Sequence, residues 1–385
     1  MIPVIYPYKE EKQMNIPFYR VEVGGDEREK IDEVLDGEAP DIIKDLESAF
    51  ESYIGASYAL ATSHGTAALH LAMLAIDLKR GDKVLCSINA YPSVPEVVRH
   101  FDAEPIFIDI DPDTFNIDLG KLEHYLSENK SKKLKAVIVS HVGGQSVDLD
   151  RLYEIAKQYD VKIVEDASDA LGATYKGQKI GSAGADITCF DFSPHLRRNV
   201  CNGGMLVSDD EEIIERARLL RNHAMVTEDE SLGYIYDVTD IGSQYMMSPL
   251  DAATILVQLE KQDDIIERQR EIAAVYNERL EGAPHIKLPI ANDEHPYSLY
   301  IIKVDKNRDS FARELSARGI ECGLHYIPLH LLSYYKAKYS LRVNDFPVAL
   351  RSYQQVLSIP NYAALSDDEV DEICEAILDV ASTRV

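Results

Sequence analysis

The sequence has no tryptophan, few cysteines and far less positive than negative charge. It holds 40 lysines and arginines against 66 aspartates and glutamates, so its formal net charge is −26. A field of that sign repels nucleic acid and anionic membranes, and we exclude both as partners. The five cysteines are scattered without a CxxC pair: Cys86, Cys189, Cys201, Cys322 and Cys374. This pattern indicates reduced thiols, no structural zinc and a cytoplasmic protein.

Long hydrophobic runs are also missing. No apolar run approaches the roughly 20 residues that span a bilayer. The first residues, MIPVIYPYKEEKQMNIPFYR, have no continuous apolar core beside a basic end, so we do not expect a signal peptide. We expect residues 1–20 to form an extended arm. The chain of 385 residues is long enough for one large domain and one smaller domain.

Short β-branched runs alternate with helical stretches from about residue 45 onward. The runs are YALATS, KVLCSI, PIFIDI, KAVIVSH, KIVEDA, ITCFDFS and GMLVSD. Buried runs of this length, alternating with helices, predict an α/β fold with a mostly parallel sheet between helices. The last two runs are separated only by PHLRRNVCNG, which favours a hairpin.

A long helix is predicted from Ser248 to Gly282, with Ser248 as its cap and Pro249 in its first turn. We place a domain boundary there, between a large α/β domain at 21–247 and a smaller one at 248–385. The second part contains a strand, SLYIIKV, and two helices, RDSFARELSARGI and DDEVDEICEAILDVAS. These elements predict a small C-terminal α/β domain.

Two motifs place polar groups where α/β sheets bind ligands. Gly65 and Thr66 lie where a turn opens a helix, and the unpaired N–H groups of a helix start can bind an anion. The alternative is an ordinary helix start. Asp166 follows the buried run KIVE, at the carboxyl end where such sheets keep ligands. It either partners a cation or caps a helix.

From about Pro17 onward the chain resembles the nucleotide-sugar aminotransferases of the DegT/DnrJ/StrS group. The matching stretches include HGTAALHLAM, AYPSVPEVVRHFDAEPIFIDID, SHVGGQSVDLD, VEDASDALGATYKGQKIGS, RLLRNHAMV, SPLDAATILVQLEKQ, LHYIPLH and FPVALRSYQQVLSIP. The resemblance implies the fold-type I pyridoxal phosphate-dependent transferase fold and a role in polysaccharide biosynthesis. It further implies pyridoxal or pyridoxamine phosphate as cofactor, a sugar nucleotide as ligand, and a homodimer with sites at the subunit interface.

The resemblance also implies roles for individual residues. Gly65 and Thr66 would hold the cofactor phosphate. Tyr91 would stack on the pyridine ring, and Asp166 would pair with the ring nitrogen so that the ring can act as an electron sink. Three further positions would lie near the substrate: His141, Gln145 and His325.

One segment, DFSPHLRRNVCNGG, departs from the family at its central residue. When it is aligned without a gap on its Phe, its Pro and its Gly-Gly, Leu196 stands where the family has the Schiff-base lysine. The arginines that follow stay protonated and cannot act as nucleophilic amines. No lysine lies between Lys179 and Lys261, so a shifted alignment does not supply one.

Other substitutions fall on the cofactor side of the site. Asp191 replaces a phosphate-binding serine, and Asp169 replaces a neutral residue beside the ring hydroxyl. Gln244 and Met246 replace an Asn and an Arg that serve the neighbouring subunit. A carboxylate near a phosphate costs about 1 kcal/mol in a wet site and more in a dry one. We expect Asp191 to accept hydrogen bonds from the helix start at Gly65 and to exclude the cofactor phosphate.

Four functions remain open. The favoured one is a lysine-less homologue that does not transaminate and binds a sugar nucleotide or a partner, with no cofactor at all as one possibility. The second is a pyridoxamine phosphate-dependent keto-sugar dehydratase with His195 as its base. The third is a standard aminotransferase, which requires the alignment at Leu196 to be wrong. In the fourth function, four side chains converge on a metal or an amino-bearing ligand. They would be His64, Asp166, Asp169 and Asp191.

Overall fold

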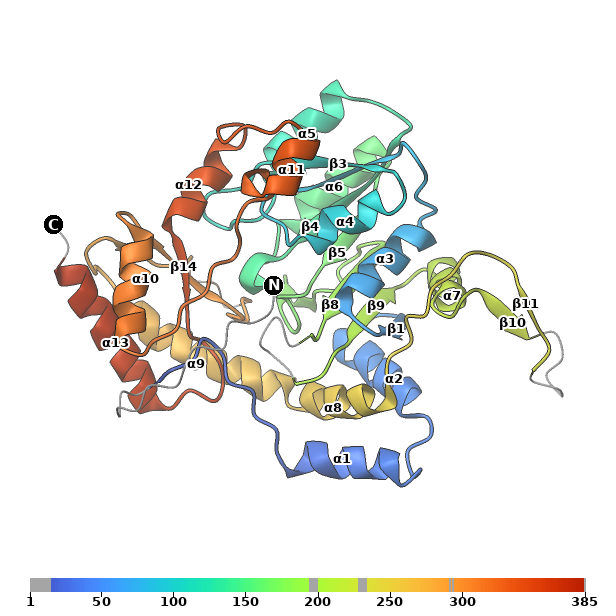
Figure 1. Cartoon of the computed structure of the whole chain (residues 1–385), viewed down its shortest axis with the longest axis horizontal. Coiled ribbons are helices and arrows are strands. Elements are labelled where there is room, and N and C mark those ends of the chain that lie inside the picture. The colour runs from blue at the N-terminus through green and yellow to red at the C-terminus, as the bar shows by residue number, and fades with distance from the viewer. Residues whose placement is uncertain (1–14, 194–199, 228–233, 291, 293, 384–385) are drawn as a thin grey trace.

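The computed structural model describes residues 15–193, 200–227, 234–290, 292 and 294–383 (Figure 1). A seven-stranded sheet lies at the centre of the larger part of the chain. Its strand order is β1-β9-β8-β5-β4-β2-β3. The strands are β1 (Tyr58–Thr62), β2 (Lys83–Ser87), β3 (Glu104–Ile108), β4 (Leu134–Ser140), β5 (Lys162–Asp166), β8 (Ile187–Asp191) and β9 (Gly204–Ser208). Strand β9 is antiparallel to both its neighbours, and the other adjacent pairs are parallel. The expected α/β fold and its hairpin are confirmed.

Helices cover both faces of this sheet. They are α2 (Ile42–Ile54), α3 (Gly65–Ala75), α4 (Ser93–Arg99), α5 (Leu119–Glu128), α6 (Leu149–Tyr159) and α7 (Glu211–Leu220). Successive strand residues point to opposite faces, so Leu85 joins the core under α2, α5 and α6, whereas Cys86 joins the core under α3, α4 and α7. The sheet is therefore buried on both faces, which explains its continuous apolar runs.

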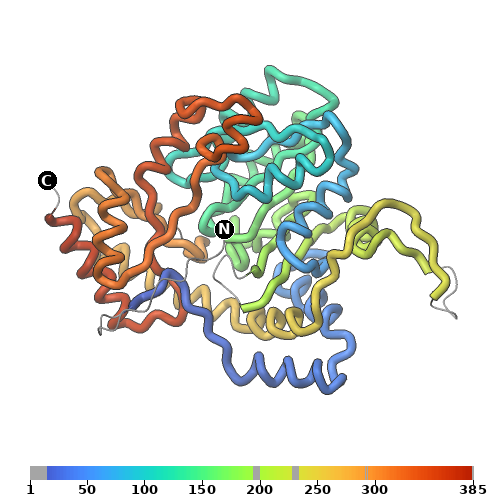
Figure 2. The backbone as a smooth tube through the Cα atoms, in the orientation of Figure 1, coloured from blue at the N-terminus to red at the C-terminus, as the bar shows by residue number. Residues whose placement is uncertain are grey.

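A second, smaller sheet lies with the C-terminal helices at the other end of the molecule (Figures 1 and 2). Its strands are β12 (Ile286–Lys287), β13 (Tyr300–Val304) and β14 (Val356–Ile359), paired antiparallel. The helices nearby are α10 (Arg308–Ala317), α12 (Pro347–Gln355) and α13 (Asp367–Ser382), whereas α11 (Ser333–Lys338) packs against β3 of the large sheet through the rings of Tyr335 and Phe107. The strand and the two helices predicted for this part are present.

The predicted long helix is two helices. Helix α8 (Pro249–Glu260) starts as expected, with the Ser248 hydroxyl accepting the amide of Leu250 at 3.3 Å. Helix α8 ends at Glu260, Lys261 lies between the two helices at φ −93° and ψ −1°, and α9 (Gln262–Arg279) follows. The Lys261 ammonium binds Asp26 and Glu27 of α1 (Gly25–Leu35). A single uninterrupted helix was therefore the wrong prediction.

The described part of the expected arm runs beside the C-terminal part of the chain. Ile16 is fully buried and pairs in parallel with Ile320. The remaining short strands are β6 (Thr174–Tyr175), β7 (Gln178–Lys179), β10 (Met225–Thr227) and β11 (Tyr236–Val238). Within the described ranges, every helix is too short or too polar to cross a membrane.

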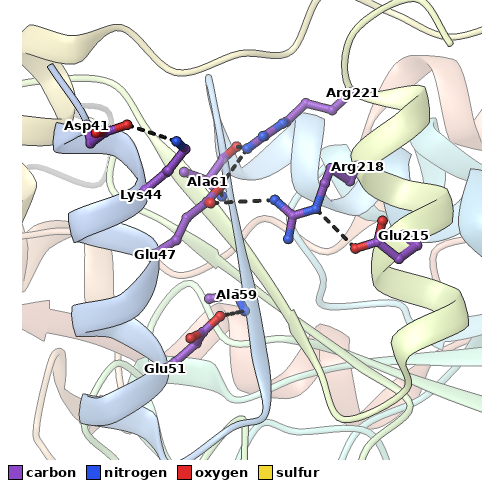
Figure 3. A network of polar contacts seen from close by, with 9 residues as sticks. All are labelled: Asp41, Lys44, Glu47, Glu51, Ala59, Ala61, Glu215, Arg218 and Arg221. Carbon is purple, nitrogen blue, oxygen red and sulfur yellow. Dashed lines mark hydrogen bonds and ion pairs between the residues drawn. The ribbon is translucent and has the colours of Figure 1, made fainter. Parts of the chain in front are cut away.

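A buried ion pair holds α2, β1 and the end of α7 together (Figure 3). The Arg221 guanidinium donates to Glu47 Oε1 and to the Ala61 carbonyl, each at 2.7 Å. The same Glu47 oxygen accepts the Ala61 amide at 2.8 Å. Both side chains are nine-tenths buried or more. This network fixes the strand that leads directly into the helix start at Gly65.

Candidate functional site

A cleft of about 450 Å³ opens where the carboxyl ends of β4, β5 and β8 meet the first turn of α3. This is the edge at which parallel α/β sheets keep their ligands. Seven residues selected from the sequence line it together: Gly65, Thr66, Tyr91, His141, Asp166, Asp169 and Asp191. The structure brings these seven residues together, and the roles implied for them stay predictions.

Asp191 lies directly against the helix start. Its Oδ1 accepts the Gly65 amide at 3.3 Å and the Ser193 amide at 2.9 Å. A Cβ atom at Gly65 would lie 2.3 Å from the Cβ of Asp191, so only glycine allows this approach. The expected contact between Asp191 and the helix start is confirmed at Gly65, and for the amide of Thr66 it stays a prediction.

The close approach also depends on the glycine pair that ends the central segment. A Cβ atom at Gly204 would lie within 2.6 Å of the backbone of His64 and Gly65. Gly204 pairs with Thr62 on one side and with Asp191 on the other. The antiparallel strand β9 therefore brings the Asp191 carboxylate and the amide of Gly65 into contact.

Asp166 is a buried carboxylate at the floor of the cleft. It accepts hydrogen bonds from the hydroxyls of Ser140 and Ser168. Burial, together with the negative charges of Asp169 and Asp191, raises the pKa of Asp166 to about 6. The cleft therefore opposes further negative charge at its floor.

The raised pKa predicts a stability effect. Asp166→Asn should stabilise the folded chain by about 2–3 kcal/mol above pH 6, because an unfolded aspartate titrates near 4 and each pKa unit is worth about 1.4 kcal/mol. The folded state holds the extra proton between about pH 4 and 6, so wild-type stability falls as the pH rises through that window. Urea unfolding from pH 4 to 8 should show this slope in the wild type and in Asp264→Asn, an exposed control. A slope that survives in Asp166→Asn would contradict the assignment.

His141 lines the cleft and is held by a buried carboxylate that sequence reasoning missed. Its Nδ1 accepts the Val147 amide at 3.3 Å, so the proton lies on Nε2, 3.7 Å from Glu165 Oε2. Glu165 also accepts the hydroxyls of Tyr153 at 2.8 Å and Thr188 at 2.9 Å. Burial acts to raise the pKa of Glu165, but these partners outweigh it and lower the pKa. The hydrogen bond from the Val147 amide orients the His141 ring, with Nε2 toward Glu165.

Tyr326 is a second residue that sequence reasoning missed. Its hydroxyl donates to Asp169 Oδ2 at 3.3 Å, and its ring meets that of Tyr91 edge to face, with centroids 5.9 Å apart. The predicted residue, His325, instead stacks on Phe18 and hydrogen bonds to Ser358 at 2.8 Å. The motif LHYIPLH identified the right segment, but the neighbouring side chain enters the cleft.

The other selected residues lie elsewhere. Gln145 donates to the carbonyl of Ser146, and Gln244 is exposed, with a backbone bridge to Asn222. His195 and Leu196 fall outside the described residues. In the described ranges no three His, Cys, Asp or Glu side chains are grouped as a metal site, so the structure gives no support to the metal hypothesis.

The cleft fits only part of a pyridoxal phosphate. Tyr91 and Asp166 suit an aromatic ring with a protonated nitrogen. The phosphate end does not fit, because Asp191 already occupies the helix start and its charge repels a phosphate. Among the described lining residues there is no lysine or arginine to offset that charge.

Comparisons with known proteins find relatives over nearly the whole chain. The family model described as DegT/DnrJ/EryC1/StrS aminotransferase matches residues 23–378. The spore coat polysaccharide biosynthesis protein SpsC of Bacillus subtilis is 33% identical over 95% of this chain and 97% of its own length. GDP-perosamine synthase of Caulobacter vibrioides is 30% identical over 92% of this chain and 95% of its own.

A solved structure is similar over nearly the whole fold. Spr1654 of Streptococcus pneumoniae, described as a sugar aminotransferase, superposes with a TM-score of 0.89 and 28% identity. The match covers 96% of this chain and 98% of that one. Spr1654 has been solved both in an apo form and in a pyridoxamine phosphate form.

Proposed function

The chain belongs to the DegT/DnrJ/EryC1/StrS sugar aminotransferase family, and from this premise we propose that it is a member that does not transaminate and that binds a sugar nucleotide. The observation that carries the proposal is the hydrogen bond from the Gly65 amide to Asp191. A helix start bound to an internal carboxylate is no longer available to an external phosphate. The cleft then keeps the family's shape without its anchor for the cofactor.

The sequence of the central segment supports the same proposal. Transamination by this family needs a lysine amine, and the 81 positions from Ile180 to Glu260 hold none. Arginine cannot replace it, because its guanidinium stays protonated. An internal bond between cofactor and chain would therefore need a lysine from a distant part of the sequence.

A sugar nucleotide and a second copy of the chain are the proposed partners. One relative is named for a GDP-linked sugar, which supports a ligand of that class. The hairpin β10–β11 projects from the body of the molecule (Figure 1), and Met225, Val226, Tyr236 and Val238 on it are exposed. Exposed apolar side chains gathered on one projection are typical of an interface, which supports a homodimer. The five free cysteines agree with a cytoplasmic location.

Borohydride reduction tests the proposal. The purified chain, incubated with pyridoxal phosphate and reduced, is expected to carry no pyridoxyl group on any lysine near the cleft, and to show no visible aldimine absorbance. Spr1654 treated in parallel is the positive control. A stable adduct on a cleft lysine, found by peptide mass spectrometry, would contradict the proposal and indicate a standard aminotransferase. Turnover of a keto sugar nucleotide with pyridoxamine phosphate, abolished by His195→Asn, would instead make it a dehydratase.

A further inference from the structure

A second cavity of about 670 Å³ lies beside the cleft and shares Ser168 and Asp191 with it as a common wall. A space of this size admits a small molecule or several side chains. Its apolar lining combines the arm, the segments that follow β5 and β8, and parts of α8 and α9. These lining residues are Tyr19, Leu171, Phe192, Ile255, Leu259 and Ile265. Of the described residues that line the cavity, Asp191 alone carries a charge.

Four other hollows of the described surface are more highly charged. The cleft itself has the carboxylates of Asp166, Asp169 and Asp191. Three open grooves each have five or six charged side chains in their lining. An apolar segment that entered any of these would remove charged groups from water, and burying a charge is costly. The second cavity is therefore the hollow best suited to an apolar segment.

Residues 1–8, MIPVIYPY, are such a segment, and they lie outside the described residues. These eight residues contain no charge, whereas the next four, KEEK, are all charged. The match to the family model begins at residue 23, so the segment lies outside the matched region. Pro3 and Pro7 lack a backbone N–H and favour an extended backbone. Extended segments with prolines bind in hollows lined by aromatic rings, and Tyr19 and Phe192 provide such rings here.

The described part of the arm leads this segment to the cavity. The Ile16 amide donates to the Gly319 carbonyl at 2.8 Å, and the Ile16 carbonyl accepts the Glu321 amide at 3.0 Å. Tyr19, which lines the cavity, is three residues further along, so the Cα atoms of Ile16 and Tyr19 are no more than about 11 Å apart. The link between the segment and Ile16, residues 9–15, spans up to about 25 Å when extended. The segment is therefore within reach of the cavity of its own chain.

We infer that residues 1–8 dock in this cavity, so that the chain itself supplies the occupant. Apolar side chains such as Ile5 and Tyr6 leave water for the apolar lining, which is a favourable transfer. The charged link KEEK stays outside, where water solvates it. Because the cavity shares the wall of Ser168 and Asp191 with the cleft, a docked segment backs that side of the cleft. The segment acts as an internal strap beside the candidate site, a role that depends on no particular cofactor or sugar.

Tryptophan fluorescence of the full chain tests this inference, because the chain has no tryptophan of its own. Tyr6→Trp places a single reporter in the segment, and Glu10→Trp places one in the charged link. The emission of the Tyr6→Trp chain should be shifted to shorter wavelength. Acrylamide should quench it about fivefold to tenfold less than the Glu10→Trp chain, because a docked residue is accessible only in the minor undocked population.

Two variants of the cavity should release the segment. Ile265→Asp, made in the Tyr6→Trp chain, puts a charge into the apolar lining, and Ser298→Phe fills the cavity without adding a charge. Each should return the emission and the quenching of Tyr6→Trp to the values for Glu10→Trp. Ile76→Asp, at a half-buried isoleucine that follows α3 and does not line this cavity, is the matched control and should leave the reporter protected. Thermal unfolding shows which variants keep the fold.

Mixing distinguishes the segment of the same chain from that of a second copy. The Tyr6→Trp chain with Ile265→Asp is incubated with an excess of wild-type chain, whose cavity is intact and which adds no tryptophan. The reporter should stay exposed. Renewed protection would show that the cavity takes its occupant from a neighbouring copy and would overturn the inference. Equal quenching of Tyr6→Trp and Glu10→Trp, or protection that persists in a folded cavity variant, would overturn it as well.

Discussion

Asp191→Ser is expected to raise the affinity of the chain for pyridoxal phosphate by about tenfold to a hundredfold. The substitution removes the Asp191 carboxylate from the helix start. In the wild type this carboxylate accepts a hydrogen bond from the Gly65 amide at 3.3 Å, so its removal frees that amide. Repulsion between two unit charges about 4 Å apart is worth about 1 kcal/mol in water and about 4 at the dielectric near a protein surface. Equilibrium dialysis or fluorescence titration at fixed salt measures the change. If the proposed function is right, no transaminase activity should appear, because residues 180–260 hold no lysine.

Asp191→Asn separates charge from volume. It keeps the size of the side chain and removes its charge, so its affinity should lie between those of the wild type and the serine variant. Asp150→Ser, on the exposed surface and ion-paired with Lys176, is the control and should leave affinity unchanged. Cofactor affinity that is already high in the wild type, with Asp191→Ser having no effect, would show that the carboxylate does not exclude the phosphate.

Glu47→Ala is expected to lower the free energy of unfolding by about 3–5 kcal/mol. The substitution leaves the Arg221 guanidinium buried without its carboxylate, and removing one partner of a buried pair has a cost of that size. It also deprives the Ala61 amide of its acceptor. Urea unfolding at constant chain concentration measures the effect, and the variant should unfold at a markedly lower urea midpoint.

Glu51→Ala is the matched control, one helical turn along α2 (Figure 3). Glu51 accepts the Ala59 amide at 2.9 Å but pairs with no buried arginine in the network drawn, so its loss should cost about 1 kcal/mol. The double variant Glu47→Leu with Arg221→Met should recover much of the loss, since apolar replacements often match buried ion pairs. Equal costs for Glu47→Ala and Glu51→Ala would contradict the assigned role of the pair.

The sheet could be predicted from the sequence because strands that are buried on both faces consist of continuous apolar residues. Each strand of the central sheet is a short apolar run, and the antiparallel hairpin followed from the short link between its strands. The break at Lys261 could not be predicted in the same way, because no proline or glycine stands there. At this position the Lys261 side chain pairs with Asp26 and Glu27, more than 200 positions away. A local sequence pattern does not predict which distant residues will pair in the fold.

Residues of the cleft could be selected from the sequence where the residue type itself indicates a role. Residues were missed where only the direction of the side chain decides whether it enters the cleft. Gly65 and Asp191 follow from chemistry that few other residues supply. Tyr326 and His325 are neighbours in the sequence, but the Tyr326 side chain enters the cleft whereas the predicted His325 stacks on Phe18.

The pairing of β1 with β9 has a consequence for synthesis on the ribosome. β1 lies at one edge of the sheet, and its hydrogen-bonded neighbour there is β9, which is made roughly 140 residues later. At about 5–20 residues per second, the segment YALAT remains without this partner for roughly 7 to 28 s. An unpaired apolar strand in that interval can join other chains instead. Slow translation between residues 62 and 204 should therefore lower the yield of folded chain more than an equal delay after residue 208.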